Sequence, residues 1–264
     1  MRILDWDQFV REVLPGPLAL SIGVFDGVHR GHQKLIEKIR HYAAEHGALG
    51  GLITFIQNPR RILRPGQYPG DIYSLPQKLK VMEDLGAAFV VLIDFSGDIS
   101  RITGREFITR VGLGRVAYLA LGAGFRCGYR LDTDARAIQT LSAPFGTLTE
   151  LVDQVREGGA PVSSSRIRQA LLAGDLAGAA ALLGRPFRIS LEGLEPEITG
   201  ETCCYDLGKE GRVLPPGGSY AARVCTADSP EGWETSVALE SGRLFLFPAP
   251  PNLNVLSVEL CSSQ

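Results

Sequence analysis

The sequence predicts an α/β fold in which a doubly wound parallel sheet is followed by a small all-β domain of barrel-like form. Up to about Ala181, continuous apolar runs alternate with segments of helical periodicity, which is typical of a parallel sheet covered by helices on both faces. Beyond Arg185-Pro186 the helical periodicity disappears, and short β-like runs alternate with clusters of Pro, Gly, Asp and Ser. A chain of 264 residues can hold two such cores, and we expect domains at residues 1–186 and 187–264.

Five apolar runs are the predicted strands of the parallel sheet, and helical segments lie between and after them. The helix after the first strand begins near Arg30 and ends at about His46, because its apolar residues recur at helical spacing and Gly47 follows. The predicted strands are Leu18–Val24, Gly51–Phe55, Phe89–Phe95, Val116–Leu121 and Thr147–Val152. The other predicted helices are Leu75–Leu85, Arg105–Val111, Ser165–Ala173 and Leu176–Leu183. The β-like runs of the second domain are Ser219–Thr226, Glu234–Leu239, Arg243–Phe247 and Asn254–Leu260.

Composition restricts the class of protein. The apolar fraction of 45% is typical of a globular protein, and the sequence has no run of about 18 apolar residues and no signal-peptide pattern at its start. We therefore expect a cytoplasmic protein without a membrane partner. Five cysteines without Cys-x-x-Cys spacing predict reduced thiols rather than a zinc site or a disulfide framework.

The net charge of −2 conceals an asymmetry between the two predicted domains. Through Arg188 there are 23 Lys and Arg against 18 Asp and Glu, a net charge of +5, and from Ile189 onward 4 against 11, a net charge of −7. This distribution indicates that the first domain handles an anionic ligand. We expect small-molecule partners and no nucleic acid, and the sequence leaves the oligomeric state open.

The stretch Gly-Val-Phe-Asp-Gly-Val-His-Arg-Gly-His, from Gly23 to His32, is the most informative part of the sequence. It leads from the first predicted strand through a glycine-containing turn into the first long helix. His29 and His32 are one helical turn apart, so both imidazoles can lie on the same face. The place suits an anion, because helix N-terminal N–H groups and the positive end of the helix dipole meet there and glycines let a phosphate approach the backbone.

Two imidazoles at such a site can donate hydrogen bonds to a polyphosphate and stabilise the charge that grows on it during transfer. The chemistry indicated is phosphoryl or nucleotidyl transfer. A single histidine at a helix start is explained equally well by a bond to the backbone, but the pair and its lead-in favour a phosphate site. All 4 histidines lie between His29 and His46, so no other histidine cluster competes for a metal or a general base.

A second candidate segment is the serine run Ser163–Ser165, which precedes a helix that carries Arg168. Hydroxyls, N-terminal N–H groups and a guanidinium can converge there on phosphate oxygens. Ordinary N-capping by serine explains the same residues. The phosphate site indicated by His29 and His32 favours binding.

Two loops at the carboxyl ends of predicted strands are further candidates. After the second strand, Arg60 and Arg61 can take a second anionic substrate, although a solvated arginine pair is the alternative. After the fourth strand, the glycine-rich loop Gly122–Arg130 offers Phe125 for stacking on a flat ring and Arg126 for charge or cation–π contact. A turn that needs positive φ angles explains its glycines equally well.

Three segments, in this order and at suitable separations, resemble the adenylyltransferase module of the prokaryotic bifunctional riboflavin kinase/FAD synthetases. They are Gly23–Gln33, Ser163–Arg168 and Ala170–Phe187. The resemblance is specific, because the general nucleotidyltransferase signature has the two histidines without the Phe-Asp-Gly-Val lead. It implies a Rossmann-like nucleotidyltransferase fold and the reaction ATP + FMN → FAD + pyrophosphate, assisted by Mg²⁺ that enters as MgATP.

The resemblance also implies which residues act. The catalytic residues would be His29, His32 and Arg168. The ATP-binding residues would be Gly23, Phe25, Asp26, Gly27, His29, Gly31, His32, Ser164, Ser165 and Arg168. The FMN-binding residues would be Asn58, Arg60, Phe125 and Arg126. No general base is required, because the FMN phosphate is already an anionic nucleophile, and the metal ligands are not identified.

The sequence departs from the family pattern in both domains. Phe55-Ile56-Gln57-Asn58-Pro59 stands where the family has Phe-x-Pro-His-Pro, and Gly124 replaces the acid or amide before the loop phenylalanine, which bears on flavin or metal binding. The family's kinase module carries Pro-Thr-Ala-Asn, and no such motif remains near Gly200–Leu207. We therefore expect an FMN adenylyltransferase without riboflavin kinase activity, whose β domain is a cover or a dimerisation surface.

Three other functions remain open. The chain can be a bifunctional enzyme whose kinase site is rebuilt from other residues. It can be a non-catalytic flavin- or nucleotide-binding protein, an interpretation that the residues Gln57, Asn58 and Gly124 suggest. It can also be an adenylyl- or cytidylyltransferase for another phosphate acceptor, since such enzymes share the two histidines.

Overall fold

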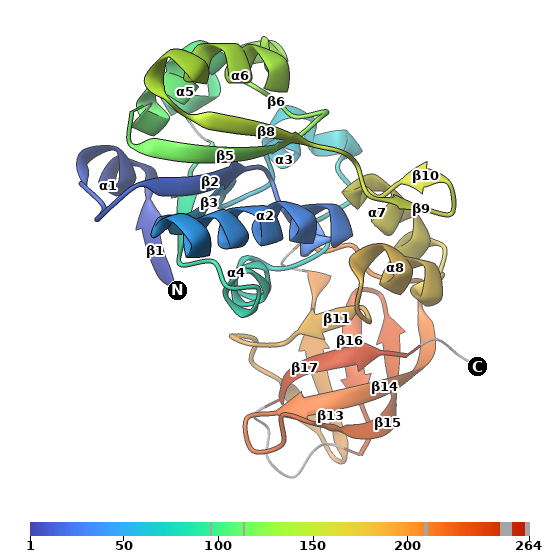
Figure 1. Cartoon of the computed structure of the whole chain (residues 1–264). Helices are drawn as coiled ribbons and strands as arrows, with labels where there is room; N and C mark the ends of the chain where they lie inside the picture. The colour runs from blue at the N-terminus through green and yellow to red at the C-terminus, as the bar shows by residue number, and fades with distance from the viewer. Residues whose placement is uncertain (96, 113, 209–210, 249–254, 262–264) are drawn as a thin grey trace. The chain divides into compact units, whose positions relative to one another are not determined.

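The computed structural model describes residues 1–95, 97–112, 114–208, 211–248 and 255–261, which form two compact units (Figure 1). The first unit comprises Met1–Pro65 and Leu79–Pro161. The second comprises Gly66–Lys78 and the chain from Val162 onward. The expected domain boundary between residues 186 and 187 stays a prediction.

Six parallel strands form the sheet of the first unit and confirm the predicted α/β fold. In sheet order the strands are β1 (Arg2–Asp5), β4 (Phe89–Ile93), β3 (Leu49–Phe55), β2 (Leu18–Ile22), β5 (Val116–Gly122) and β8 (Leu148–Val152). From the central strand β2, the chain first adds β3 and β4 on one side and then β5 and β8 on the other. The winding direction therefore reverses beside β2. Ligands of open α/β sheets bind at the carboxyl ends of strands that flank such a reversal.

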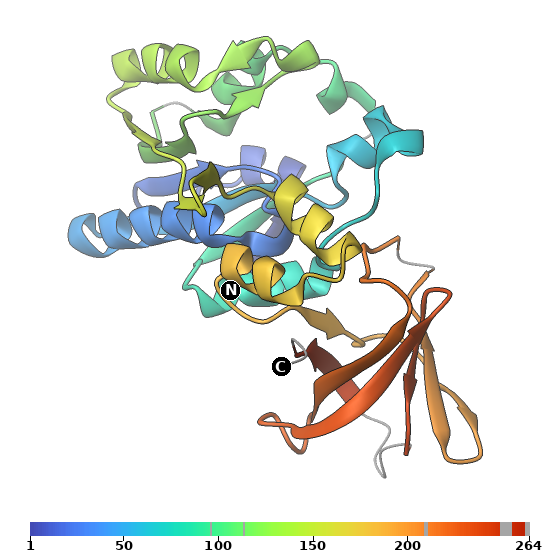
Figure 2. The same ribbon diagram turned by 90° about the vertical axis from the view of Figure 1, so that its right-hand side faces the viewer.

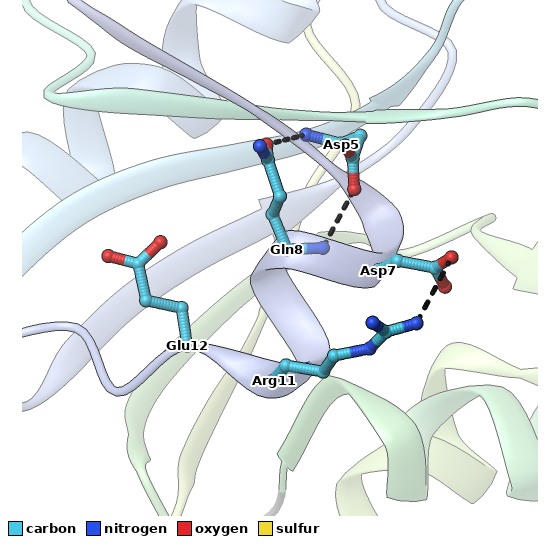
Figure 3. A pocket seen from close by; sticks show the side chains of 5 residues that line it. All are labelled: Asp5, Asp7, Gln8, Arg11 and Glu12. Atoms are coloured by element: carbon cyan, nitrogen blue, oxygen red, sulfur yellow. Dashed lines mark hydrogen bonds and ion pairs between the residues drawn. The ribbon is translucent and has the colours of Figure 1, made fainter.

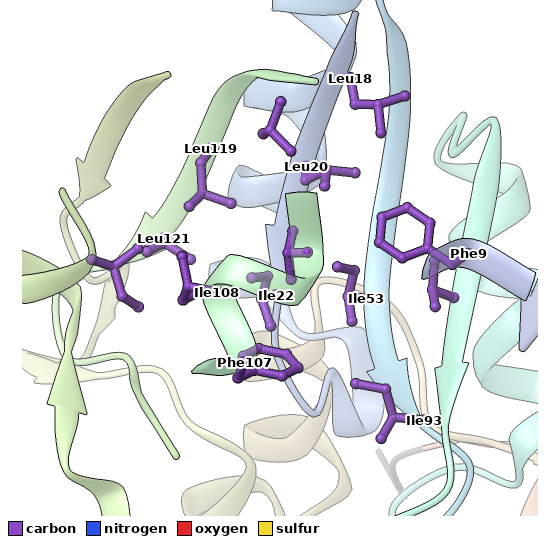
Figure 4. Packing of buried hydrophobic residues seen from close by; sticks show 14 of the residues in the cluster. Phe9, Leu18, Leu20, Ile22, Ile53, Ile93, Phe107, Ile108, Leu119 and Leu121 are labelled. Carbon is purple, nitrogen blue, oxygen red and sulfur yellow. The ribbon is translucent and has the colours of Figure 1, made fainter. Parts of the chain in front are cut away.

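One face of this sheet is covered by α1 (Trp6–Arg11), α5 (Gly104–Gly112) and α6 (Ala135–Ser142). Side chains alternate between faces along a strand, so Leu18, Leu20 and Ile22 of β2 all point to this side. Figure 4 shows them packed with Phe9 and with the aromatic and aliphatic side chains of α5. Burial of each such side chain contributes about 1.5–3 kcal/mol, and this packing fixes the position of the central strand.

The opposite face is covered by α2 (Arg30–His46) and α4 (Leu75–Asp84), and α2 lies along the sheet in Figure 1. Leu35, Ile36 and Ile39 of α2 are buried against residues of β2, β3 and β5. The predicted helix limits are confirmed, because α2 runs from Arg30 to His46 and ends at Gly47 in the left-handed conformation, φ 62°. The sheet thereby positions the first turn of α2 directly after β2.

From Val162 onward, the described residues of the second unit form two helices and a seven-stranded antiparallel sheet, which confirms the predicted all-β region. The helices are α7 (Ser164–Leu172) and α8 (Leu176–Leu183). The strands curve into an open barrel (Figure 2). In sheet order they are β11 (Arg188–Ser190), β17 (Val255–Leu260), β14 (Gly218–Thr226), β15 (Trp233–Glu240), β16 (Arg243–Leu246), β13 (Thr202–Asp206) and β12 (Glu197–Thr199).

All predicted strands and helices exist in the structure, with limits that differ by a few residues. The predicted start of the last strand at Asn254 lies outside the described residues. Elements β1, α1 and α6 and the strands β11, β12 and β13 of the second unit were not predicted from the sequence. The remaining elements are η1 (Asp26–Val28), α3 (Pro59–Leu63), η2 (Pro65–Gln67), η3 (Gly97–Ser100), β6 (Arg126–Cys127), η4 (Tyr129–Leu131), β7 (Thr133–Asp134), η5 (Ala143–Phe145), β9 (Arg156–Glu157) and β10 (Ala160–Pro161).

Within the residues that the structure describes, none of the helices has both the length and the apolar character that crossing a bilayer requires.

Candidate functional site

The turn between β2 and α2 has an unusual backbone. Phe25 has φ 54°, Gly27 has φ 75° and Val28 has φ 40°. Left-handed backbone is unfavourable for phenylalanine and more so for the β-branched valine. Both of these side chains are fully buried, so packing against the core holds the strained turn.

Hydrogen bonds from three directions fix the same turn. The Val28 N–H donates to the Phe25 carbonyl at 3.1 Å. Thr54, buried at the end of β3, donates its hydroxyl to the Val24 carbonyl at 2.9 Å. Gln33 of α2 donates its side-chain amide to the Val28 carbonyl at 2.9 Å. The turn is therefore a rigid link between the sheet and the helix, and Thr54 is a supporting residue that the sequence analysis did not single out.

His29 is the N-cap residue of α2. Its Nδ1 accepts the backbone N–H of His32 at a long 3.4 Å, and its side chain is buried. A neutral imidazole that accepts through Nδ1 carries its proton on Nε2. Capping and donation to a phosphate are therefore compatible in one ring, because they use different nitrogens.

The two predicted imidazoles lie together. The rings of His29 and His32 stack with centroids 3.7 Å apart and planes inclined by 14°. The Phe25 ring is tilted by 55° to the His32 ring, with ring centroids 5.0 Å apart. A Cβ atom on Gly31 would lie 3.2 Å from Cε1 and Nδ1 of His29, so glycine at this position gives the His29 ring its room.

The other predicted ATP-binding residues of this turn are packed within it. A Cβ atom on Gly23 would lie 3.2 Å from the Phe25 ring, so Gly23 makes space for that ring. Asp26 and Gly27 are buried in η1. Arg30, the first residue of α2, forms an ion pair with Glu157 of β9. The seventeen-residue helix α2 thus begins at a turn rich in buried groups.

Asn58 and Arg60, two of the four predicted FMN-binding residues, follow β3. Asn58 is buried and caps α3, because its Oδ1 accepts the Arg60 N–H at 3.1 Å. The Arg60 side chain is exposed. The amide of Asn58 therefore has a structural task, whereas the guanidinium of Arg60 faces solvent at the carboxyl edge of the sheet.

The other two predicted FMN-binding residues lie in the loop after β5, which is more ordered than its glycines suggest. Phe125 packs against the core cluster of the first face. Arg126 donates through Nε at 3.0 Å and Nη2 at 2.8 Å to the Leu131 carbonyl, which closes the hairpin of β6 and β7. Burial, with a contribution from Asp132, raises the pKa of the Cys127 thiol to about 12.

The predicted residues Ser164, Ser165 and Arg168 belong to the second unit. Ser163 is the N-cap of α7, since its hydroxyl accepts the Arg166 N–H at 3.3 Å. Ser164 is half-buried and Ser165 is exposed in the first turn. Arg168 is only 4% exposed and donates through Nε to the Gly70 carbonyl at 2.8 Å and through Nη2 to the Tyr68 hydroxyl at 3.2 Å.

A shallow pocket of the first unit lies on α1 (Figure 3). Its lining is polar, and local contacts explain it. Asp5 and Gln8 form a capping box, Arg11 pairs with Asp7 at 3.7 Å, and Glu12 pairs with Arg2. This pocket is separate in sequence from every predicted site residue and does not combine groups suited to catalysis.

No group of three or more His, Cys, Asp or Glu side chains that could hold a metal ion occurs in the described parts of the chain. Mg²⁺ in phosphate-transfer sites commonly binds one or two carboxylates together with substrate phosphates and water.

A doubly wound sheet with paired histidines at the start of the helix after its central strand defines a nucleotidyltransferase. The family model for FAD synthetase matches residues 13–166, more than half of the sequence. The chain belongs to the FAD synthetase family, as the sequence resemblance predicted.

Curated relatives support the same family. The bifunctional riboflavin kinase/FMN adenylyltransferase of Escherichia coli K12 is 30% identical over 210 residues, which cover 78% of this chain and 67% of the relative. The protein of the same description from Bacillus subtilis 168 is 29% identical over 212 residues, covering 78% and 66%. That from Pseudomonas fluorescens is 34% identical over 173 residues, covering 64% and 55%. The matches thus span between half and two thirds of the length of these relatives.

A solved structure shares the fold. The "Macrolide-efflux Protein from Streptococcus pneumoniae" superposes with a TM-score of 0.80 and 21% sequence identity, covering 98% of this chain and 89% of that chain. At this identity the likeness concerns the fold alone.

Proposed function

We propose that the protein is an FMN adenylyltransferase that converts FMN and MgATP into FAD and pyrophosphate. A phosphate oxygen of FMN attacks the α-phosphorus of ATP and forms the new P–O bond. The bond from the α-phosphorus to the oxygen that bridges it to the β-phosphate breaks, and its electron pair leaves with pyrophosphate. No proton has to be removed from the nucleophile, so positioning and charge neutralisation are the main requirements.

The observation that carries this proposal is the stack of His29 on His32 at the start of α2. The N–H groups and dipole of this helix favour an anion. Because His29 uses Nδ1 for the cap, its Nε2–H is the donor suited to a phosphate oxygen. Donors fixed in advance by packing stabilise developing charge without reorganising during the reaction.

Further residues are proposed to bind ATP or FMN, or to support the residues that do. Arg168, with Ser164 and Ser165, binds the polyphosphate. Arg60 is exposed after β3 and suits the phosphate of FMN, with Asn58 supporting it as the cap of α3. Phe125 and Arg126 act by holding the loop after β5 near the flavin, since both have contacts within the protein. ATP and FMN are the partners, and a cytoplasmic location stays a prediction from the sequence.

The proposal includes the absence of riboflavin kinase activity. In the region where the family carries Pro-Thr-Ala-Asn, the chain has Thr202-Cys203-Cys204-Tyr205. Cys203 and Tyr205 are buried in β13, and burial raises the pKa of both Cys203 and Tyr205. Neutral buried groups are poor ligands for ATP and Mg²⁺, which supports the loss of the kinase reaction.

Chromatographic separation of flavins tests both parts of the proposal. FMN with MgATP should yield FAD and pyrophosphate, and riboflavin with MgATP should yield no FMN. Formation of FMN would instead identify a bifunctional enzyme. Calorimetric binding of ATP or FMN without release of pyrophosphate would identify a binding protein, and turnover with a different phosphate acceptor would identify another nucleotidyltransferase.

A further inference from the structure

The second unit contains a contact network that links its β-sheet to Arg168. We infer that Tyr68 and Gly70 are positioning residues for Arg168 and that the β-sheet acts on adenylyl transfer by holding them. This inference rests on the proposed role of Arg168 in binding ATP. It assigns to the β domain a task in adenylyl transfer that does not require kinase chemistry.

The orientation of Arg168 is set by a segment that lies far away in the sequence. Its Nε donates to the Gly70 carbonyl at 2.8 Å, its Nη2 donates to the Tyr68 hydroxyl at 3.2 Å, and its Cζ lies 5.2 Å from the centre of the Tyr68 ring. A guanidinium is planar and its donors point in fixed directions. Two hydrogen bonds and a ring contact therefore hold the guanidinium of Arg168 in one orientation.

The segment that holds Arg168 is itself held by the chain at residues 211–213. Asp71 and Arg212 form a parallel β-bridge, in which the Asp71 N–H donates to the Gly211 carbonyl at 3.0 Å and the Val213 N–H donates to the Asp71 carbonyl at 2.9 Å. The Tyr68 hydroxyl donates to the Asp71 carboxylate. The phenol is thus fixed between Arg168 and the bridge.

Gly70 permits this close approach of two backbones. Its φ is 119°, and a Cβ atom there would lie 2.7 Å from the Arg212 carbonyl carbon and the Gly211 oxygen. Real Cβ atoms do not come so near to backbone atoms, so any side chain at this position would separate the two strands of the bridge. The same glycine supplies the carbonyl that Arg168 contacts.

The 211–213 stretch is in turn fixed to the antiparallel sheet. Arg212 donates through Nη1 to the Ser190 carbonyl of β11 at 2.5 Å, and Val213 is buried. The continuous path runs from β11 through Arg212 and the bridge to Gly70, Tyr68 and Arg168. A displacement of the sheet relative to α7 would therefore change the direction of the guanidinium.

Three substitutions in the full-length protein test the inference. Gly70→Ala should open the bridge, and Tyr68→Phe should remove the hydroxyl while keeping the ring. For each we expect the KM for ATP to rise by about 10-fold, the factor associated with a lost hydrogen bond to a charged group, with kcat changed by less than about twofold. The matched control is Gly66→Ala in the same segment, where a Cβ atom meets nothing within 4 Å, and it should behave as wild type.

A double-mutant cycle separates positioning from general stability. If Tyr68 acts through Arg168, Tyr68→Phe should have no further effect on the KM for ATP in an Arg168→Ala background. A purely structural role would add its full effect in that background and would overturn the inference. Tyr68→Phe retains the half-buried ring, so it supplies the answer even where Gly70→Ala fails to fold.

The outcomes for the two proposals differ. Absence of FAD formation by wild type overturns the proposed function and this inference with it. Normal FAD formation by wild type with an unchanged KM for ATP in Arg168→Ala overturns the proposed role of Arg168 and this inference, and leaves the proposed function standing. Normal wild-type activity and a raised KM in Arg168→Ala, together with wild-type behaviour of Tyr68→Phe, overturn this inference alone.

Discussion

The imidazole of His32 lies flat against that of His29, with 3.7 Å between ring centroids. The two rings form one packed unit, because His29 also accepts the His32 N–H through Nδ1. Phe25 supports this unit on the side of His32. Substitutions at these residues can therefore separate the effect of helix capping from that of phosphate binding.

His29→Asn should keep the helix cap and abolish most of the activity. Asparagine is as good an N-cap as any residue, so the free energy of unfolding should stay within about 1 kcal/mol of wild type. Loss of a fixed donor to the reacting phosphates should lower kcat by about 100-fold. Thermal unfolding and the rate of FAD formation measure the two quantities. Wild-type turnover in His29→Asn would show that capping is the only task of this residue.

Gly31→Ala should reduce activity without reducing helix stability. Alanine is preferred over glycine within helices by about 1 kcal/mol, which offsets the cost of a contact at 3.2 Å between its Cβ atom and the His29 ring. The ring must move by a few tenths of an ångström, and we expect kcat/KM to fall by about 10-fold. Steady-state kinetics and a thermal melt on the same sample provide the test, and unchanged kinetics would contradict it.

Glu150 should contribute to stability above its unfolded pKa and lose that contribution in acid. A hydrogen bond from Lys38, with another from Tyr118 at 2.5 Å, lowers the pKa of Glu150 below its usual 4.5. A carboxyl group whose pKa is lower in the folded than in the unfolded protein stabilises the fold at pH values above its unfolded pKa. This stabilisation disappears as the pH falls through the folded pKa. The Tm of wild type should therefore fall more steeply below about pH 4.5 than that of Glu150→Gln.

Tyr118→Phe is the intermediate case for the same experiment. It removes one hydrogen bond to Glu150 and leaves the Lys38 ion pair, whose nitrogen–oxygen distance is 2.7 Å. The dependence of its Tm on pH should lie between that of wild type and that of Glu150→Gln. Parallel Tm profiles for all three proteins would show that this network does not couple folding to protonation.

Arg115→Ala should destabilise the first unit. The Arg115 guanidinium donates to the carbonyls of Phe9 at 2.9 Å and Glu12 at 3.0 Å, at the end of α1. Removing it leaves these acceptors without that donor, which should cost about 2–4 kcal/mol in denaturant unfolding. The control is Arg11→Ala in α1, the helix that Arg115 contacts. The exposed ion pair of Arg11 with Asp7, at 3.7 Å, should contribute less than about 0.5 kcal/mol to the free energy of unfolding.

Sequence reasoning was most successful where one local pattern determines the structure. The limits of α2 followed from apolar spacing and from Gly47, and both are confirmed. The edge strand β1 and helix α1 were missed because each is very short. Helix α6 was missed although Asp134 is a recognisable cap, whose carboxylate accepts the Ala137 N–H at 2.9 Å.

The site was predictable in part. The spacing of His29 and His32 placed both rings on one helical face, and the structure brings them into contact. The sequence left open whether the serine run caps a helix or binds phosphate, and in the structure Ser163 caps α7. That Asn58 caps α3 was not predicted. The sequence gave no sign of Tyr68 or Gly70, because their proposed task depends on Arg168, which is 100 and 98 residues away along the chain, respectively.

The chain leaves the first unit after Pro65 and returns to it at Leu79, before it crosses for the last time after Pro161. During synthesis on the ribosome, residues 66–78 therefore emerge long before Arg168 and Arg212, the residues that complete their contacts. The parallel sheet has all its strands once residue 152 has been made, whereas the second unit must wait for the distant part of the chain, and loop closure over such a separation is slow. A nascent chain that stalls near residue 161 would expose the 66–78 segment to chaperones and proteases.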